Sequence, residues 1–446
     1  MKITVYGTGY VGLVTAICLA DKGLTVYCID KDREKIDKIK SGNAPIYEPG
    51  LDLLLKKVNS RLIPTTDSRE AIKNSKVIFI AVGTPFDGKK IDLSQVKSAS
   101  IELGYQLRNT KDYKVVVIKS TVIPETTRKV IIPLVLKHSK KGGSEIGFCM
   151  NPEFLREGKA IEDFNNPDRI VLGVSSKRVE KIMRKIYSAY KDADVFITNL
   201  TTAEMIKYTA NSFLALTISF SNEISRICAK LNSVDSVEVF KGVILDKRIS
   251  PIVKDIRIYP ELVSYLHAGC GFGGSCFPKD VKALESFQYQ LGLNSRLING
   301  ILSVNAEQID FVFRTGIDNY RGKVLRNIGI LGTAFKPDTD DIRESPGIKL
   351  AELALKNDFN VIVNDFVALE NTRKYFGNKV KCEDNPLYVI KKSDLIFITT
   401  IWDKYKKIND RVYEKLLKRN ALVIDCRALY SDRPSKKWRI KIGEGK

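Results

Sequence analysis

Histidine is scarce in this chain: His138 and His267 are the only two in 446 residues. Eight cysteines are present, but no two of them are spaced as a Cys-x-x-Cys pair. Zinc sites are built mainly from such pairs and from histidine, so we expect no metal site. The same scarcity argues against a mechanism that relies on a histidine general base.

Long apolar runs and an export signal are also missing. The longest apolar stretch, "SFLALTISF" at 212–220, is too short to span a bilayer. The first residues, "MKITVYGTGY", lead directly into a strand pattern without the apolar core of a signal peptide. We therefore expect a cytoplasmic protein without membrane contact, whose cysteines are mostly buried free thiols.

Charge is biased toward the positive sign, with 73 Lys and Arg against 52 Asp and Glu and a net charge of +21. Such an excess raises the question of nucleic-acid binding. The lysines are spread along the chain and interleaved with acids, as in "DKDREKIDKIK" at 30–40. We therefore expect no nucleic-acid partner and a surface that attracts anionic small molecules such as nucleotides.

Strand and helix patterns alternate through the first 200 residues and again from about residue 324. Short β-branched runs separated by helix-length segments indicate a parallel, doubly wound sheet. Between the two stretches, 201–231 is a helical run that is apolar on most sides, and we expect it to be buried between domains or subunits. The expected strands are 2–7, 24–30, 76–83, 113–120, 146–150 and 169–174, then 326–332, 359–365, 394–400 and 421–426.

A glycine motif, "GTGYVG", follows the first expected strand and opens a helix. In such a turn Gly7 makes the tight bend, Gly9 lets the backbone approach a pyrophosphate, and Gly12 allows close helix–strand packing. The helix N-terminus favours the phosphate charge. The motif therefore predicts dinucleotide binding. The cofactor contacts expected within it are Gly7, Gly9, Tyr10, Val11 and Gly12.

Asp30 ends the second expected strand, eighteen residues beyond the last glycine of the motif. Its carboxylate can accept hydrogen bonds from a ribose diol and would repel a 2′-phosphate, which favours NAD over NADP. Lys31 and Arg33 lie close by and leave NADP open.

One cysteine has unusual neighbours, in "GFGGSCFPKD" at 271–280. The proline two residues later suits the first turn of a helix, so Cys276 lies just before a helix N-terminus and beside Lys279. Both influences favour the thiolate. Asp280 lies four residues on and can share that helical face. The stretch predicts a nucleophile, with a packed cysteine in a tight loop as the alternative.

Two other segments place polar groups four residues apart. Glu153 and Glu157 have this spacing in "NPEFLREGKA", where a solvated helix face is the alternative interpretation. Lys207 and Asn211 have it in "AEMIKYTANSF", within the apolar helical run. A lysine and an amide inside a buried helix need polar partners.

Together these motifs resemble the nucleotide-sugar 6-dehydrogenases, in the order typical of that family and over nearly the whole chain. The resemblance implies an α/β fold of two Rossmann-like doubly wound domains joined by a long central helix with a helical middle region, and a homodimer formed around that helix. The implied domains are 1–200 for NAD, 201–315 for dimerisation and substrate, and 316–446 for the UDP-sugar. The motifs are "GTGYVG", "VGTPFDGKKIDLSQV", "KSTVIPETT", "NPEFLREG", "AEMIKYTANSF", "GFGGSCFPKD", "GTAFKPDTDDIRESP" and "DCRALY".

The resemblance also implies a reaction, the four-electron oxidation of a sugar C6 hydroxymethyl group to a carboxylate with two NAD⁺ in succession. Cys276 matches the nucleophile that captures the aldehyde as a thiohemiacetal, which becomes a thioester and is then hydrolysed. Lys207 and Asn211 match the groups that stabilise oxyanion character at C6. Asp280 and Glu153 match the acid–base carboxylates.

Further roles come from the same resemblance. Thr121 matches a threonine that helps to order the water and contacts the cofactor, and Lys336 and Arg427 are pyrophosphate partners on charge alone. The other expected cofactor contacts are Lys35, Thr84, Glu157, Lys279 and Arg343. The expected substrate contacts are Glu153, Phe154, Leu155, Lys207, Asn211, Tyr265, Gly269, Phe272, Gly273, Lys336 and Arg427.

Some positions depart from the family pattern. "KSTVIPETT" replaces the usual KSTVPVGTT, which puts an acid in that loop, and Cys426 stands where a glycine is common. Either Arg248 or Arg257 could be the arginine that reaches the sugar of a neighbouring subunit.

The motif "GGSCFPKD" with "FKPDTDDIRES" is closest to the family members that act on UDP-glucose. GDP-mannose and UDP-N-acetylhexosamines, other nucleotide sugars of the family, stay open as substrates. Two other classes stay open as well. One is a two-electron alcohol dehydrogenase, which would not need Cys276, and the other is a nucleotide-binding protein without catalysis.

Overall fold

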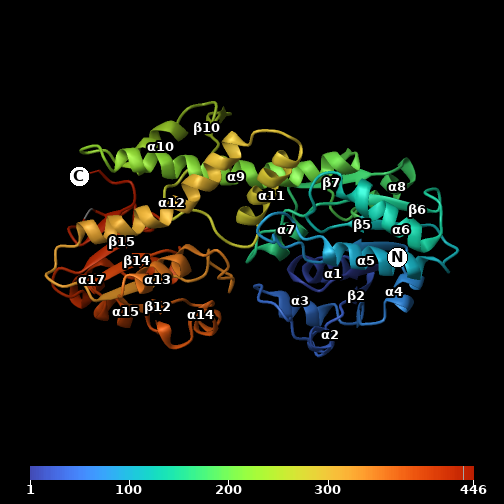
Figure 1. The fold of residues 1–446 in the computed structure, drawn as a ribbon, viewed down its shortest axis with the longest axis horizontal. Helices are drawn as coiled ribbons and strands as arrows, with labels where there is room; N and C mark the ends of the chain where they lie inside the picture. The colour runs from blue at the N-terminus through green and yellow to red at the C-terminus, as the bar shows by residue number, and fades with distance from the viewer. Residues whose placement is uncertain (435, 446) are drawn as a thin grey trace. The chain divides into compact units, whose positions relative to one another are not determined.

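The computed structural model describes residues 1–434 and 436–445 (Figure 1). They divide into two compact units, an N-terminal unit Met1–Ala210 and a C-terminal unit Asn211–Lys446. Across this described part of the chain, no helix has both the length and the apolar composition that crossing a membrane would require. The boundaries of the three domains suggested by the sequence stay a prediction.

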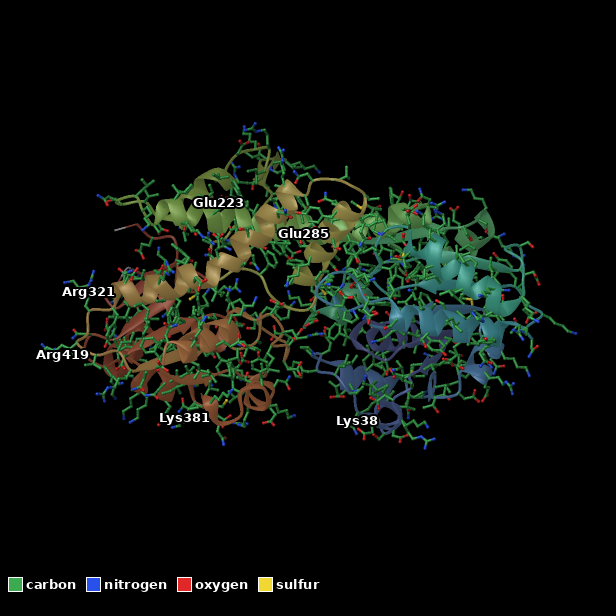
Figure 2. All side chains as sticks on the ribbon, viewed as in Figure 1. Lys38, Glu223, Glu285, Arg321, Lys381 and Arg419 are labelled. Carbon is green, nitrogen blue, oxygen red and sulfur yellow. The ribbon has the colours of Figure 1, made fainter. Side chains whose placement is uncertain are left out.

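The excess positive charge is carried by side chains on both units. Lys38 projects from the N-terminal unit, and Arg321, Lys381 and Arg419 project from the C-terminal unit (Figure 2). This agrees with the interleaved charge pattern of the sequence.

The N-terminal unit is built on one eight-stranded sheet with helices on both faces. Residues of β4 alternate between two cores, since Val77 and Phe79 pack in one and Ile78 and Ile80 in the other. Burial of both faces explains why the strands are continuous apolar runs in the sequence. In spatial order the strands are β3 (Leu62–Thr65), β2 (Thr25–Ile29), β1 (Lys2–Tyr6), β4 (Val77–Ile80), β5 (Lys114–Ile118), β6 (Ile146–Met150), β7 (Arg169–Val174) and β8 (Asp194–Thr198). The helices are α1 (Tyr10–Asp21), α2 (Arg33–Lys40), α3 (Leu51–Lys57), α4 (Ser68–Asn74), α5 (Ser94–Leu107), η1 (Thr127–Ile131), α6 (Ile132–Ser139), α7 (Ala160–Asn165) and α8 (Lys177–Ile186).

One pair of strands departs from the parallel arrangement: β6 and β7 are antiparallel. A parallel neighbour requires a crossover that returns along the whole sheet. The connection 151–168 contains only the short helix α7, which packs against α1, so the chain re-enters the sheet at the edge where β6 ended. The loop before α7 therefore stays at the carboxyl edge of the sheet, next to the turn after β1.

The C-terminal unit contains most of one long helix, a helical segment and a six-stranded parallel sheet. In spatial order the sheet strands are β13 (Lys381–Cys382), β12 (Asn360–Asn364), β11 (Asn327–Leu331), β14 (Leu395–Ile398), β15 (Leu422–Asp425) and β16 (Arg439–Lys441). A two-stranded hairpin, β9 (Ile252–Val253) and β10 (Ile256–Arg257), lies outside this sheet. The helices are α9 (Leu200–Cys228, which starts in the N-terminal unit), α10 (Ser236–Ile244), η2 (Glu261–Tyr265), α11 (Phe277–Gln290), α12 (Arg296–Asn319), α13 (Pro346–Lys356), α14 (Leu369–Phe376), η3 (Gly377–Lys379), α15 (Pro386–Lys392), α16 (Asp403–Lys406) and α17 (Asp410–Leu416).

The two units share a strand order and a first turn. β13-β12-β11-β14-β15-β16 repeats the order β3-β2-β1-β4-β5-β6. Gly332 after β11 has φ +108°, as Gly7 after β1 has φ +99°. A Cβ on Gly12 would overlap the Gly7 carbonyl oxygen, and a Cβ on Gly347 would overlap that of Gly332. These glycine pairs are five residues apart in the first turn and fifteen apart in the second, so the second turn carries ten additional residues.

Every strand predicted from the sequence is present, and so is the long helix after residue 200. The strands that the sequence analysis missed in the two sheets are all edge strands: β3, β8, β13 and β16. An edge strand has one neighbour and is partly exposed, so it lacks the continuous apolar run that marks an interior strand.

The end of the chain ties the second sheet to α10 within the C-terminal unit. The Gly443 carbonyl accepts the Ser236 N–H at 3.0 Å, and Lys441 Nζ lies 2.5 Å from Asp235 Oδ2. Gly443 has φ +81°, and a Cβ at this position would overlap Ser236 Oγ. Both the backbone conformation and the packing therefore favour glycine.

We expect Gly443→Ala to lower the free energy of unfolding of the C-terminal unit by about 2 kcal/mol, because overlap with Ser236 adds to the strain of a positive φ. Gly292→Ala is the matched control, since Gly292 has φ +73° but nothing lies within 4 Å of a Cβ there. Urea unfolding followed by the fluorescence of Trp402 and Trp438, both in this unit, measures the difference. Equal losses in the two variants would contradict the packing argument.

Candidate active site

The turn between β1 and α1 has room for a ligand at one glycine and none at the other two. A Cβ on Gly7 would lie 2.7 Å from the Ala81 carbonyl oxygen, and one on Gly12 would overlap Gly7. Gly9 is the N-cap of α1, and nothing lies within 4 Å of a Cβ built there. The N–H groups at the start of α1 can therefore receive a pyrophosphate, as the sequence predicted.

Asp30 follows β2 and faces this turn. Its Oδ2 accepts hydrogen bonds from the Thr8 N–H at 2.8 Å and the Thr8 hydroxyl at 2.7 Å, and its Oδ1 accepts the Asp32 N–H at 3.1 Å. Burial acts to raise the pKa of this carboxyl, but these hydrogen bonds outweigh it and hold the pKa below the usual value. The ionised Oδ1 keeps acceptor capacity for a ribose hydroxyl.

The equivalent aspartate of the C-terminal unit, Asp365, has a different environment. Its Oδ2 accepts the N–H groups of Thr333 and Ala334 at 2.7 and 3.0 Å and the Trp402 indole at 3.3 Å. Its Oδ1 accepts the N–H groups of Val367 and Ala368, both at 3.0 Å. Five donors of the same unit occupy the two oxygens of this carboxylate. The second turn therefore lacks the acceptor capacity for a ribose that Asp30 has.

A buried ion pair lies after β6 in the N-terminal unit. Lys207 Nζ is 3.0 Å from Glu153 Oε1, and both side chains are almost completely buried, with 4% and 6% exposed. Glu153 Oε2 also accepts the Leu155 N–H at 2.7 Å. Burial acts to raise the pKa of Glu153, but the charge of Lys207 outweighs it and the pKa stays below the usual value. The structure therefore brings together a desolvated carboxylate and an ammonium that the sequence placed fifty-four residues apart.

Phe154 covers this pair. Its ring lies 5.4 Å from Lys207 Nζ and 4.0 Å from the Arg169 guanidinium carbon. Cations above an aromatic face are stabilised by the ring, which helps to retain Lys207 in its buried place.

A second lysine in this cluster was missed in the sequence analysis. Lys119, directly after β5, is 5% exposed and donates to Asn151 Oδ1 at 3.1 Å, which also accepts the Tyr187 hydroxyl at 2.5 Å. Burial lowers its pKa to about 8, and the charge of Glu153 opposes that shift. The sequence feature that could have identified Lys119 is its position as a charged residue directly after a run of β-branched residues.

Two threonines predicted to contact cofactor and water meet at the same sheet edge. Thr84 Oγ1, after β4, donates to the Thr121 carbonyl oxygen at 2.8 Å. The loop that follows is anchored by Glu204 of α9, whose carboxylate accepts the N–H groups of Glu125 and Thr127 at 2.6 and 2.7 Å. Glu125, the acid that departs from the family pattern, has φ +74° and pairs at the surface with Arg128 and Lys129.

Glu48 joins the cofactor turn to the loop that carries Glu153. It is 5% exposed, and it accepts the Tyr10 hydroxyl and the N–H groups of Gly158 and Ala160, both at 2.7 Å. Glu157 is half-buried in the same loop. No sequence pattern points to this role, because Glu48 lies in an irregular segment between α2 and α3.

Cys276 is the N-cap of α11 and is half-buried. The glycines before it fit closely against the additional loop of the second turn: a Cβ on Gly273 would overlap the Glu344 carbonyl oxygen, and the Gly274 N–H donates to the Arg343 carbonyl at 3.0 Å. This contact fixes the backbone just before the thiol. Its place at the helix N-terminus is the one expected from the sequence.

Asp280 lies one turn into α11 and is 1% exposed. Its Oδ2 accepts Asn211 Nδ2 at 2.6 Å, and its Oδ1 is bonded to Lys279 Nζ. The structure therefore gathers four of the predicted residues, Cys276, Lys279, Asp280 and Asn211, at the start of one helix.

Aromatic and glycine residues predicted to contact substrate lie around that helix start. The Phe277 ring lies 6.2 Å from the ring of Phe272 and 6.4 Å from that of Tyr265. A Cβ on Gly269 would lie 2.6 Å from the Cys426 carbonyl oxygen and 3.4 Å from Arg427 Cδ. The Arg427 side chain is held here by a bond from its Nε to the Thr399 carbonyl at 3.0 Å.

Cys426, the departure from the usual glycine, is fully buried and its thiol contacts that of Cys270. Burial acts to raise the pKa of Cys270, but the hydrogen bond from Cys426 and the charge of Arg427 outweigh it and lower the pKa.

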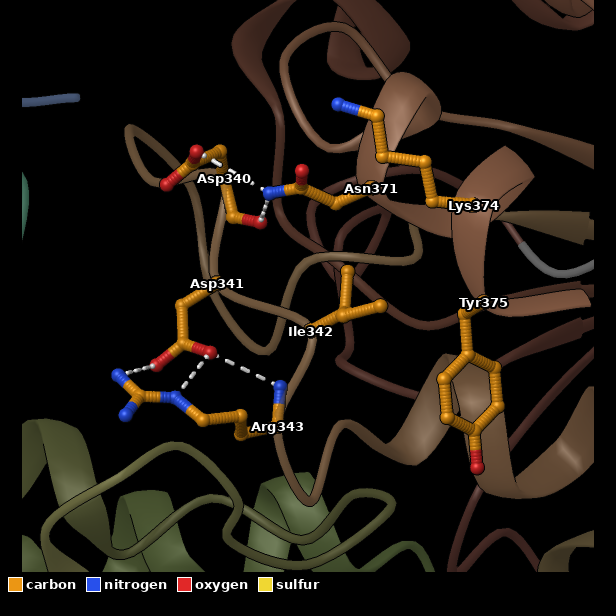
Figure 3. Close-up of a pocket in the computed structure, with 7 residues that line it drawn as sticks. All are labelled: Asp340, Asp341, Ile342, Arg343, Asn371, Lys374 and Tyr375. Carbon is orange, nitrogen blue, oxygen red and sulfur yellow. Dashed lines mark hydrogen bonds and ion pairs between the residues drawn. The ribbon is translucent and has the colours of Figure 1, made fainter. Parts of the chain in front are cut away.

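Arg343, predicted to contact the cofactor, lines a pocket of about 480 Å³ in the C-terminal unit (Figure 3). Its guanidinium forms a fork with Asp341, at 2.8 Å from Nε and 2.7 Å from Nη2. Lys374 and Tyr375 line the same pocket (Figure 3). A cofactor contact by Arg343 would have to share the guanidinium with Asp341 and stays a prediction.

The remaining predicted residues are placed as follows. Lys336 Nζ lies 5.6 Å from the Phe335 ring centre, and Lys35 Nζ lies 3.9 Å from Asp32 Oδ2. The Arg248 side chain is 90% exposed and pairs with Asp246, whereas Arg257 donates to the carbonyl oxygens of Leu245 and Ser250. The choice between the two arginines stays open.

The glycine turn, the open start of α1 and Asp30 beside that turn are typical of dinucleotide-binding proteins of the doubly wound α/β class. Residues 1–191 match the NAD binding domain of the UDP-glucose/GDP-mannose dehydrogenase family. Residues 201–307 match its central domain and residues 329–432 its UDP binding domain. The chain belongs to this family.

Relatives are similar over almost the whole chain. A UDP-glucose 6-dehydrogenase from Pseudomonas aeruginosa is 36% identical over 445 residues, which cover 97% of this chain and 94% of that protein. A solved UDP-glucose dehydrogenase from the hyperthermophilic archaeon Pyrobaculum islandicum has a TM-score of 0.87 at 35% identity and covers 100% of this chain and 96% of its own. A solved UDP-D-ManNAc dehydrogenase from Pyrococcus horikoshii has a TM-score of 0.82 at 29% identity, with 100% and 99% covered.

Replacing the buried lysine, as Lys119→Met, tests its lowered pKa. Because the folded-state pKa of about 8 lies below the usual 10.5, the folded protein binds fewer protons than the unfolded chain between these pH values. The stability of the wild type should therefore rise relative to Lys119→Met from about pH 8 upward, with no relative change below it. Calorimetric unfolding of both proteins from pH 7 to 10 measures this. Parallel stability curves would refute it.

Proposed function

We propose that this chain oxidises UDP-glucose at C6 to UDP-glucuronate with two NAD⁺, through a covalent intermediate on Cys276. The family, with its NAD and UDP binding domains, supports an NAD-dependent dehydrogenase of a nucleotide sugar. The observation that carries the covalent step is the position of Cys276 at the N-terminus of α11, one turn before the buried Asp280. A two-electron dehydrogenase or a binding protein would have no use for this arrangement.

The reaction divides into four balanced steps. NAD⁺, when bound, accepts a hydride from C6 in each of the two oxidations. The first leaves an aldehyde after the hydroxyl proton is lost, and the Cys276 thiolate then adds to its carbon while the oxygen gains a proton. In the second oxidation the thiohemiacetal loses a hydride from C6 and the proton of its hydroxyl group, which leaves a thioester. Water adds to the thioester carbon and gives up its two protons, the C–S bond breaks, and carboxylate and thiolate are released.

The charged residues have roles that follow from their burial. Lys207 supplies a desolvated positive charge for the C6 oxygen as it gains negative charge, and such charges act strongly in a low dielectric. Glu153, paired with Lys207, is ionised and can accept the proton of the hydroxyl or of the water. Thr121 orders that water.

Two groups of the C-terminal unit take part in the same steps. Asn211 donates to Asp280, which orients this amide, and Asp280, one turn after Cys276 in α11, is the second acid–base carboxylate of the reaction. Asn211 lies four residues after Lys207 in α9, so one helix carries both donors.

UDP-glucose is the proposed substrate because the Pseudomonas relative and the Pyrobaculum structure are both UDP-glucose enzymes by name. The second candidate is a UDP-N-acetylhexosamine, because the Pyrococcus neighbour is a UDP-D-ManNAc dehydrogenase by name. The motif "GGSCFPKD", which is closest to the family members that act on UDP-glucose, favours UDP-glucose.

The proposal includes a homodimer and a cytoplasmic location. Large apolar side chains are exposed along the central helices and the hairpin, an arrangement that a second copy would cover. The catalytic thiol must stay reduced, which fits a reducing compartment. The exposed residues are Phe213, Phe220, Ile227, Leu245, Ile252, Val253 and Ile256, with exposed fractions between 43% and 65%.

NADH released per sugar consumed tests the reaction. We expect two NADH per UDP-glucose from the wild type, and little NADH formation with GDP-mannose or UDP-N-acetylmannosamine. Cys276→Ser should lower turnover by at least about a thousandfold, since the nucleophile is lost. Cys382→Ser, which alters the other half-buried cysteine, is the matched control and should keep wild-type turnover.

One NADH per UDP-glucose would refute the four-electron reaction. Two NADH with another sugar alone would refute UDP-glucose as the substrate. Near-normal turnover of Cys276→Ser would refute the covalent step while leaving the dehydrogenase in place.

A further inference from the structure

Three amide side chains hold the loop that leads to Cys276, within the C-terminal unit. Asn305 of α12 binds both backbone groups of one residue: its Oδ1 accepts the Phe272 N–H at 2.8 Å, and its Nδ2 donates to the Phe272 carbonyl at 3.1 Å. This is the bonding that a neighbouring β-strand would provide. Gly271 has φ +82°, and a Cβ there would lie 2.5 Å from Asn305 Oδ1. The amide thus replaces a strand partner at a place where the backbone needs glycine.

The other end of this segment is held in the same way. The Gly269 N–H donates to Asn222 Oδ1 at 2.8 Å, and the Gly269 carbonyl accepts Gln308 Nε2 at 2.6 Å. Gln308 is completely buried, and its nitrogen also lies 3.3 Å from Asn222 Oδ1. Residues 269–272 are therefore clamped at both ends by side chains of α9 and α12, and we name Asn222, Asn305 and Gln308 the amide clamp.

Charged neighbours fix the orientation of Gln308. Arg226 Nε donates to Gln308 Oε1 at 2.9 Å, so the amide nitrogen is left to face Gly269. Arg226 is in turn held by Glu307 at 2.8 Å and by the Val304 carbonyl at 2.8 Å. A flipped amide would place its nitrogen against the guanidinium, which would cost a buried hydrogen bond.

We propose that Asn305 and Gln308 are positioning residues for the nucleotide sugar, which rests on the proposed function. The clamped segment begins and ends at Gly269 and Phe272, two of the predicted substrate contacts. The backbone before Cys276 is fixed independently, by the Gly274 bond to Arg343. The clamp therefore acts on sugar-nucleotide binding and leaves the nucleophile in place.

The test is whether a variant changes KM for UDP-glucose and leaves kcat and KM for NAD⁺ unchanged. Asn305→Asp keeps the acceptor for the Phe272 N–H but turns a carboxylate oxygen toward the Phe272 carbonyl. We expect KM for UDP-glucose to rise about tenfold or more, with kcat and KM for NAD⁺ within about twofold of wild type. Gln308→Glu, which keeps the acceptor for Arg226, should give the same split. Asn319→Asp, at the far end of α12, is the matched control and should change none of the three constants.

Amide hydrogen exchange of the peptide 266–275 is the second measurement and needs no substrate. Faster exchange in Asn305→Asp, confined to this peptide and missing in Asn319→Asp, is the expected result. Unchanged exchange, or faster exchange with a wild-type KM, would overturn the proposed role. A fall in kcat with KM unchanged would overturn it too, since the clamp would then act on the nucleophile. Failure of the wild type to oxidise UDP-glucose would refute the proposed function instead, and exchange would still report whether the clamp holds the loop.

Discussion

A parallel sheet brings the carboxyl ends of its strands to one edge, and the candidate site of the N-terminal unit depends on this constraint. Each strand from β2 through β1, β4 and β5 to β6 is followed within four residues by a residue of the site. Even the antiparallel step from β6 to β7 serves this edge, because it keeps the loop after β6 there. In strand order the residues are Asp30 after β2, Gly7 after β1, Thr84 after β4, Lys119 and Thr121 after β5, and Glu153 after β6.

Burial of charge makes these edge residues depend on one another. Glu153 is ionised although it is desolvated, because Lys207 and Lys119 lie near it. Lys207 and Lys119 both lie near this one carboxylate. It does not fully compensate the burial of two positive charges, and the pKa of Lys119 is therefore lowered to about 8. Removing one partner of such a cluster leaves the others uncompensated.

Residues that act through local chain features could be predicted from the sequence, and those that act through tertiary contacts could not. Interior strands, the glycine turn, Asp30 and the helix start at Cys276 follow from patterns a few residues long. Edge strands lack such a pattern because half of their surroundings is solvent. Glu48 binds backbone groups more than a hundred residues away. The sequence around Glu48 does not distinguish it from an acid on the surface, and the same holds for the amides Asn305 and Gln308 of α12.

The turn after the first strand occurs in both units, but its aspartate has different surroundings in each. In both units a glycine after the first strand and an aspartate after the second face each other, Gly7 with Asp30 and Gly332 with Asp365. Asp30 can still accept hydrogen bonds, whereas both oxygens of Asp365 accept hydrogen bonds from five donors of its own unit. The ten additional residues of the second turn instead pack against the glycines before Cys276. The same backbone geometry thus forms the glycine turn of the NAD binding domain in one unit and supports the loop before Cys276 in the other.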